Sequence, residues 1–223
     1  MKSKLAVQAF IKFAAGLIIA SLLLFLPAGT LCYPGAWLFI GVLFIPMIII
    51  GVFLLVKDPA LLERRLNSKE KESTQKGVVL VSLLMFISGF VAAALDFRFS
   101  LLPLPKGVSI AAAIVFLAGY GMYAEVLREN TYLSRTVEVS EGQKVIDTGL
   151  YGIMRHPMYT ATILMFLSMP LILGSLISFF IFLIYPVVII TRIGNEEKVL
   201  EEGLEGYTEY KQKVRYRLIP KIW

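Results

Sequence analysis

A short polar segment, "YGIMRHPMY" from Tyr151 to Tyr159, carries groups that could do chemistry at the edge of a long apolar run. It holds His156, the only histidine of the chain, between Arg155 and Pro157. Proline suits the first turn of a helix, where free N–H groups favour an anion, and ionisable groups beside a membrane core are candidates for function. The competing interpretation is a helix start at the membrane interface, with Arg155 anchored to lipid phosphates.

A second polar segment, "RIGNEEKVLEEGLEGYTEYKQKV", begins at Arg192. Arg192 and Glu196 are four residues apart, so a continuous helix places them on one face. An apolar stripe continues that face at Leu200, Leu204, Tyr207 and Val214. Glu196 is therefore expected to point inward with the stripe. The other glutamates are expected to lie largely outside it, namely Glu197, Glu201, Glu202 and Glu205. A simple intrahelical pair between Arg192 and Glu196 is the alternative.

Composition indicates which elements must position these groups. Of the 223 residues, 57% are hydrophobic and 17% are charged, whereas about a quarter of the residues of a soluble domain are charged. The mean hydropathy is +0.76. Four apolar runs, at 10–26, 37–56, 78–95 and 108–127, are each near the ~20 residues that cross a bilayer as a helix. The sequence therefore predicts an all-α, polytopic membrane protein.

A fifth apolar run, from Thr160 to Ile193, is interrupted at Pro170 and at Gly174 and Ser175. These interruptions allow one broken span or a hairpin of two short helices, and we favour the hairpin. About five to six transmembrane helices are then expected. An antiparallel hairpin brings the segment around His156 and the segment beginning at Arg192 together at one membrane face.

Loop charges predict the orientation. Lysines and arginines are concentrated in residues 57–77, in 128–157 and after Arg192, but are sparse in 27–36 and 96–107. The positive-inside rule places the basic loops and both termini in the cytoplasm. If the protein is prokaryotic, the membrane that it spans is expected to be the plasma or inner membrane. Within 57–77, leucines at helical spacing between charges predict a short amphipathic connector on the inner surface.

The two polar segments together, "GLYGIMRHPMY" and then "EEKVLEEGLEGYTEYKQKV", resemble the isoprenylcysteine carboxyl methyltransferase family of integral membrane methyltransferases. More distantly they resemble the phospholipid methyltransferases. The resemblance covers roughly residues 130–220. The apolar runs place four N-terminal transmembrane helices within 1–127, including the loop 57–77. The resemblance implies a catalytic methyltransferase region over 128–223, with the cofactor pocket, the hairpin and a cytoplasmic C-terminal amphipathic helix.

The resemblance also implies a cofactor, S-adenosyl-L-methionine, in a cytoplasmic pocket, and a lipid-like acceptor that enters from the membrane. Carried over by position, Arg192 faces the substrate, and the catalytic groups are Arg192, His156 and Tyr159. The implied cofactor-binding residues are Gln143, Lys144, Val145, Ile146, Tyr151, His156, Pro157, Met158, Tyr159 and Glu196. Two positions depart from the family pattern, because Gln143 replaces a histidine and Ala161 replaces a glycine.

The function predicted is therefore methyl transfer from S-adenosyl-L-methionine to a membrane-embedded or amphiphilic acceptor. A carboxylate, as in isoprenylcysteine O-methylation, is the expected acceptor because it is already ionised and Arg192 can hold it. A phospholipid amine or a thiol is an alternative that needs deprotonation. A sterol-reductase-like NADPH enzyme, with a related Arg-His-x-x-Tyr region, and a non-enzymatic membrane protein are further alternatives.

The expected partners are the bilayer and a lipid or lipidated acceptor. The net charge of +6 is explained by the loop bias and by a basic tail that suits anionic headgroups. Nucleic acid is therefore not an expected partner, and no metal site is expected. The sequence leaves the oligomeric state open.

Overall fold

The computed structural model describes residues 2–67, 73–134, 139 and 141–223. The long helices are α1 (Lys2–Ala28), α2 (Pro34–Lys57), α4 (Ser73–Phe99), α5 (Lys106–Glu129), α6 (Pro157–Ile172) and α8 (Ile184–Gly203). The shorter elements are α3 (Pro59–Leu66), the 3-10 turn η1 (Gly149–Gly152), α7 (Leu176–Phe182) and α9 (Tyr207–Lys213). The predicted all-α fold is confirmed.

Among the residues that the structure describes, five segments are long and apolar enough to cross a membrane. They are α1, α2, the Lys76–Phe99 part of α4, α5, and α7 with α8, which together cover Leu176–Gly203. α6 is a shorter apolar helix that begins at Pro157 and ends at Ile172. The protein is therefore a multi-pass membrane protein, as the hydropathy of the sequence predicts.

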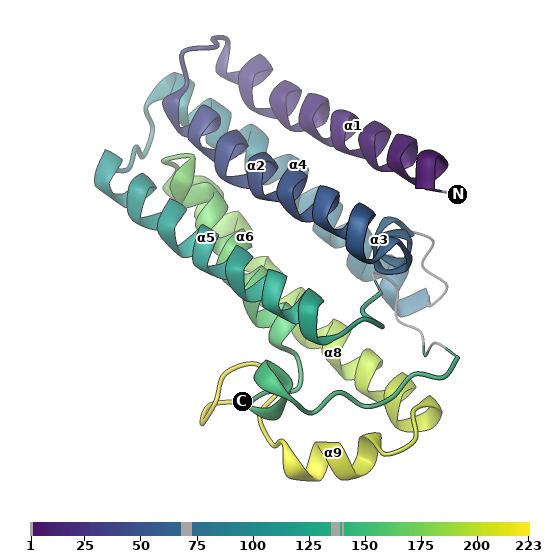
Figure 1. Ribbon diagram of the computed structural model, residues 1–223. Helices are drawn as coiled ribbons and strands as arrows, with labels where there is room; N and C mark the ends of the chain where they lie inside the picture. Colours follow the sequence, from purple (N-terminus) through teal and green to yellow (C-terminus); the bar gives the residue numbers. More distant parts are fainter. Residues whose placement is uncertain (1, 68–72, 135–138, 140) are drawn as a thin grey trace.

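The last apolar run forms the expected hairpin. α6 is its first arm and α7 with α8 is its second, and the chain turns between them at Gly174, whose φ is +77°. A left-handed backbone of this kind favours glycine, because other residues would strain it. α6 packs against α5 along the bundle, and α8 also contacts α6 (Figure 1). The start of α6 and the end of α8 consequently lie close together.

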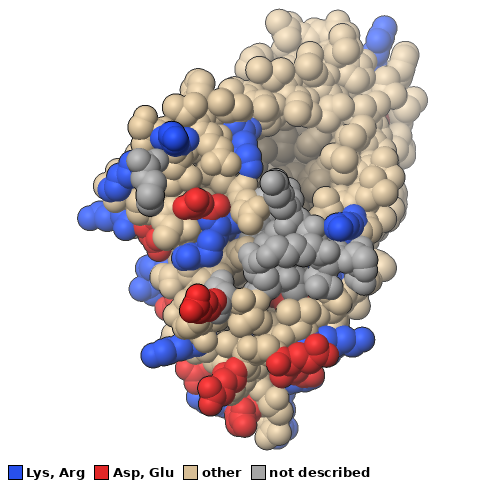
Figure 2. All heavy atoms as spheres, turned by 90° about the vertical axis from the view of Figure 1, so that its right-hand side faces the viewer, with Lys and Arg blue, Asp and Glu red and all other residues tan. Residues whose placement is uncertain are grey.

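We call the end of the bundle where α1 begins and where α3, α9 and the end of α8 lie the polar end (Figure 1). Figure 2 looks at the molecule from this side, and charged side chains gather over its lower and left parts while a large uncharged area lies above. Such a division of charged and uncharged surface fits a bundle partly enclosed by lipid. Both chain ends lie at the polar end in Figure 1. Their location in the cytoplasm stays a prediction.

Aromatic side chains hold the second arm of the hairpin against α4. Phe182 at the end of α7 is fully buried and its ring lies 5.4 Å from that of Phe86 and 6.0 Å from that of Phe90. Gly89 makes this possible, because a Cβ on it would lie 2.3 Å from the Phe182 ring. This close approach fixes the second arm of the hairpin on α4.

A buried carboxylate fastens the end of the bundle opposite the polar end. Asp96 of α4 is 1% exposed, and its two oxygens accept hydrogen bonds from the Ser175 hydroxyl (2.5 Å) and the Leu102 amide (2.7 Å). Ser175 also caps α7 by accepting from the Ser178 amide. Tyr33, the residue before α2, donates to the Leu173 carbonyl at 2.7 Å. These bonds join α2, α4 and the turn of the hairpin.

The C-terminal helix breaks where the sequence predicts that it continues. α8 ends at Gly203, Gly206 has a φ of +81°, and α9 begins at Tyr207. The expectation of one continuous helical face beyond Arg192 is therefore wrong, because the left-handed glycine turns the chain. The stripe residues still pack in one cluster, which contains Leu204, Tyr207, Tyr210 and Val214, with Leu200 against it.

Candidate active site

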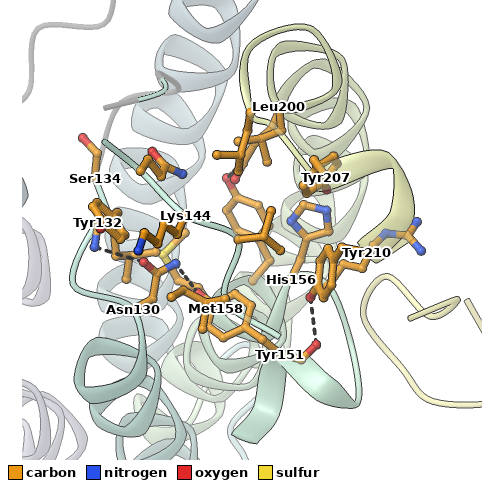
Figure 3. A pocket seen from close by; sticks show the side chains of 18 of the residues that line it. Asn130, Tyr132, Ser134, Lys144, Tyr151, His156, Met158, Leu200, Tyr207 and Tyr210 are labelled. Atoms are coloured by element: carbon orange, nitrogen blue, oxygen red, sulfur yellow. Dashed lines mark hydrogen bonds between the residues drawn. The ribbon is translucent and has the colours of Figure 1, made fainter. Parts of the chain in front are cut away.

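A hollow at the polar end brings the two polar segments together (Figure 3). It holds about 840 Å³ of space, including the part open to solvent. Its walls come from the chain after α5, from the segment before α6, and from α8 and α9. Its lining residues are Asn130, Tyr132, Leu133, Ser134, Gln143, Lys144, Val145, Ile146, Tyr151, Arg155, His156, Met158, Tyr159, Arg192, Glu196, Leu200, Leu204, Tyr207 and Tyr210.

Nearly every residue singled out from the sequence lines this pocket. The exception is Pro157, which is buried at the first position of α6 and does not line the hollow. Ala161, the second departure from the family pattern, is fully buried toward α5, where its carbonyl lies against Gly119. Gln143, the first departure, is in the pocket wall. The structure thus assembles the predicted residues, whose roles remain predictions.

Tyr159 joins the arginine and the glutamate of α8 across the hairpin. Arg192 donates from Nε to the Tyr159 hydroxyl at 2.8 Å, and this hydroxyl donates to the Glu196 carboxylate. The guanidinium carbon also lies 6.0 Å from the centre of the Tyr159 ring. Arg192 and Glu196 are therefore linked through a residue of α6, which a simple surface pair within α8 would not need.

Glu197, which the sequence pattern placed outside the inward face, is instead buried at 3% exposure. Its Oε1 accepts from Arg155 Nε at 2.8 Å and lies 3.1 Å from His156 Nε2, and its Oε2 accepts from two nitrogens of Arg217 at 2.9 and 3.1 Å. Adjacent residues of a helix point about 100° apart. α8 therefore turns Glu196 to the pocket and Glu197 to a cluster of cations behind it.

Arg155 and His156 both belong to this cluster around Glu197. Arg155 is 7% exposed and also donates to the carbonyls of Val214 (2.7 Å) and Arg215 (2.9 Å), so it is a buried structural cation rather than an anchor for lipid phosphate. His156 faces Tyr159 with ring centres 5.7 Å apart. When the neutral His156 ring donates from Nε2 to Glu197, its Nδ1 carries the lone pair.

The C-terminal tail closes the back of the site. The Arg155 and His156 amides donate to the carbonyls of Tyr216 and Arg217, each at 2.9 Å. Thr160 of α6 donates from its hydroxyl to the Leu218 carbonyl at 2.8 Å. Backbone bonds of this kind hold the segment before α6 in place although it has no regular structure of its own.

α3 supports another wall of the pocket. Arg65 donates to the Ser134 carbonyl at 2.9 Å and to the Tyr123 hydroxyl, and Arg64 donates to the Thr131 carbonyl. Within the predicted amphipathic segment 57–77, residues 59–66 form a helix with Leu61 and Leu62 buried, whereas residues 68–72 lie outside the described residues. Its hold on the pocket wall is a feature that its sequence pattern did not indicate.

Tyr151 is fixed by both of its polar ends. Its hydroxyl accepts from the Asn130 side chain at 3.1 Å, and its carbonyl accepts from the Tyr210 hydroxyl at 2.8 Å (Figure 3). Burial raises the pKa of the Tyr151 phenol above its ordinary value, more than the bond from Asn130 lowers it. Tyr151 is therefore a neutral group of the pocket wall at physiological pH.

Much of this pocket lies in a region of the chain that matches a known protein family. Residues 108–205 match the family described as "Phospholipid methyltransferase". Among solved structures, the eukaryotic intramembrane Ras methyltransferase ICMT (isoprenylcysteine carboxyl methyltransferase) superposes with a TM-score of 0.61 at 18% identity. The match covers 96% of this chain and 77% of that one. The chain has the ICMT fold. The resemblance predicted from the two polar segments is confirmed by this fold and by the matching domain.

Curated relatives point to a second group of membrane enzymes. The chain is 26% identical over 137 residues to Delta(14)-sterol reductase TM7SF2 of Mus musculus, and 24% identical over 135 residues to the Delta(14)-sterol reductase of Methylotuvimicrobium alcaliphilum. Each match covers 54% of this chain, and 33% and 32% of the two relatives. The chain spans about a third of the length of these relatives, so their activity does not transfer to it directly.

Proposed function

We propose that this protein is a membrane methyltransferase that uses S-adenosyl-L-methionine and methylates an amphiphilic acceptor, with a carboxylate as the accepting group. The observation that carries the proposal is the link from Arg192 through Tyr159 to Glu196 inside the pocket that both polar segments line. These three residues lie within the matched region 108–205. The agreement of the fold with ICMT adds support.

The lining of the pocket supports binding of this cofactor. Glu196 can balance a cationic ligand, and tyrosine rings offer faces and hydroxyls to it. The buried hydroxyl of Tyr207 has no hydrogen-bond partner within the described structure, as expected where a ligand completes the site. We expect Gln143–Ile146, Tyr151, His156, Met158 and Tyr159 to hold the cofactor, and Pro157 to fix the start of α6 beneath it. When bound, S-adenosyl-L-methionine supplies an activated methyl group.

The residues of the chain then have to position the acceptor and exclude water. An acceptor carboxylate is ionised at physiological pH and needs no base. The Arg192 guanidinium can hold and orient it, and the bond from Arg192 to Tyr159 fixes the guanidinium in turn. An amine or thiol acceptor would have to lose a proton, for which His156, Tyr159 or a carboxylate are the available groups. A carboxylate acceptor therefore requires fewer catalytic groups than an amine or a thiol acceptor.

Binding of S-adenosylhomocysteine to the purified protein in detergent tests the proposal, with isothermal titration calorimetry as the readout. We expect wild type to bind and Glu196→Gln to bind at least about tenfold more weakly, because a charge-assisted contact is lost. Glu202→Gln, an exposed carboxylate of the same helix, is the matched control. A wild-type protein that binds no S-adenosylhomocysteine would contradict the proposal.

The accepting group needs a separate measurement. Membranes that contain the protein are incubated with a labelled methyl donor, and the labelled product is treated with base. Release of label indicates a methyl ester and hence a carboxylate acceptor, whereas stable label indicates N- or S-methylation. Arg192→Lys should keep S-adenosylhomocysteine binding but lose most turnover, because lysine cannot hold a carboxylate in a planar, two-bond geometry.

A second candidate function is a reductase that uses a nicotinamide cofactor. The similarity to the two Delta(14)-sterol reductases favours it. The same calorimetric titration with NADPH distinguishes the two functions. Binding of NADPH without binding of S-adenosylhomocysteine would support the reductase and overturn the methyltransferase.

A further inference from the structure

Tyr207 is a buried pocket residue that the sequence-based assignment did not use. It is the first residue of α9, and the left-handed Gly206 before it turns the chain so that the ring lines the pocket. The residue is 4% exposed, and within the described structure its hydroxyl has no hydrogen-bond partner. A buried hydroxyl left without a partner destabilises a protein, so this group calls for an explanation.

Tyr210, one turn further along α9, provides the comparison. The two rings lie 5.8 Å apart on the same side of the pocket as His156 (Figure 3). The Tyr210 hydroxyl donates to the Tyr151 carbonyl at 2.8 Å, which gives it a structural role. Packing alone explains the ring of Tyr207 but not its hydroxyl, because a phenylalanine would fill the same space without leaving a polar group unpaired.

We propose that the Tyr207 hydroxyl binds a hydroxyl group of the pocket's ligand, which for an adenosyl cofactor is a ribose hydroxyl. This inference rests on the proposed function. It adds a ligand-binding residue from α9, outside the region 108–205 that matches the family model.

The charges around Tyr207 select the kind of ligand group. Burial, and then the negative charges of Glu197 and Glu196, raise the pKa of the Tyr207 phenol more than the positive charge of Arg155 lowers it, so the phenol remains a donor. A ligand carboxylate could not donate to Glu196, and an ammonium could not accept the phenol proton. A ligand hydroxyl can accept from Tyr207 and at the same time donate to a carboxylate such as Glu196.

The test compares Tyr207→Phe with Tyr210→Phe by calorimetry, using S-adenosylhomocysteine and its 2′-deoxy and 3′-deoxy forms. Wild type should bind one deoxy form about tenfold more weakly than the parent compound. Tyr207→Phe should bind the parent compound about tenfold more weakly than wild type does, and should no longer distinguish it from that deoxy form.

Thermal unfolding without ligand separates binding from stability. Tyr207→Phe should unfold at the same or a higher temperature than wild type, because an unpaired polar group is removed. Tyr210→Phe should unfold at a lower temperature, because the bond to Tyr151 is lost. A purely structural role for the Tyr207 hydroxyl would instead lower the unfolding temperature of Tyr207→Phe.

The outcomes keep this inference apart from the proposed function. If wild type binds S-adenosylhomocysteine and Tyr207→Phe binds it equally well, the inference is overturned and the proposed function stands. If wild type distinguishes neither deoxy form, the inference is likewise overturned. If wild type binds no S-adenosylhomocysteine, the proposed function fails, and with it the assignment of a ribose hydroxyl on this cofactor.

Discussion

Within the described part of the chain, one carboxylate is buried near each end of the bundle, and the two have opposite surroundings. Asp96, at the end opposite the polar end, is satisfied by the neutral Ser175 hydroxyl and the Leu102 amide. Glu197, at the polar end, accepts from the cationic Arg155 and Arg217 and contacts His156. Both carboxylates fasten segments that are distant in sequence.

The difference lies in what remains beside each carboxylate. Around Asp96 the hydroxyls of Ser175, Ser178 and Tyr33 all have partners within the protein. Beside Glu197, the Tyr207 hydroxyl has none within the described structure, and Glu196 faces an open hollow. A buried carboxylate therefore does not by itself indicate a ligand site. An unpaired polar group beside the carboxylate, such as the Tyr207 hydroxyl, does indicate one.

Glu197→Gln should produce the largest loss of stability. It leaves Arg155 and Arg217 facing an uncharged amide in a buried position, for which we expect a loss of about 3–5 kcal/mol. Chemical denaturation in detergent measures it. Glu196→Gln is the matched neighbour and should lose far less stability, since its side chain faces the pocket. Equal losses in the two variants would contradict the separation of their roles.

Asp96→Asn should produce the next largest loss of stability. The amide keeps one acceptor oxygen for two donors, so the Ser175 hydroxyl or the Leu102 amide is left unpaired at a cost of about 1–3 kcal/mol. The same denaturation measures the loss. Affinity for S-adenosylhomocysteine should stay at the wild-type value, because Asp96 lies at the other end of the bundle. A weakened affinity would show that the two ends are coupled.

Arg65→Gln should have a smaller effect that appears mainly in binding. The variant loses the bonds to the Ser134 carbonyl and the Tyr123 hydroxyl, which hold one wall of the pocket. We expect binding of S-adenosylhomocysteine to weaken by about three- to tenfold, measured by calorimetry. Glu63→Gln, on the exposed side of α3, should bind as wild type does. Changes of opposite sign in the two variants would point to the net charge of α3 instead.

Asp147→Asn should have the smallest effect. Asp147 and Lys213 form an exposed pair at 2.7 Å, and the hydrogen bond and charge of Lys213 hold the pKa of the Asp147 carboxyl below its ordinary value. The pair therefore stabilises the fold at neutral pH and stops doing so as the pH falls through that lowered pKa. Unfolding temperatures from pH 7 to pH 3 should show a slight difference at neutral pH that vanishes in acid and in high salt.

The fold was largely predictable because hydropathy reports spans directly. The four long apolar runs and the hairpin at Gly174 follow from segment length and from the positions of glycine and proline. The division into residues 1–127 and 128–223 stays a prediction. The break before Tyr207 was missed because a helical pattern continues through it, and only the left-handed Gly206 ends that pattern.

The site was predictable in part. The residues carried over from the family resemblance line one pocket, apart from Pro157. Glu197 was assigned to the wrong face, since the pattern considers one helix and its partners, Arg155 and Arg217, come from distant segments. Arg65 and Tyr207 were missed for the same reason. Their contacts with the pocket depend on tertiary packing that no local spacing reports.

The pairing of the segment before α6 with the C-terminal tail has a consequence for biosynthesis. The backbone partners of Arg155 and His156 are Tyr216 and Arg217, about sixty residues later in the chain. All of the membrane helices have been synthesised before these partners are made. His156 therefore reaches its final surroundings only after translation of the tail, and the pocket is completed after the last membrane helix has been made.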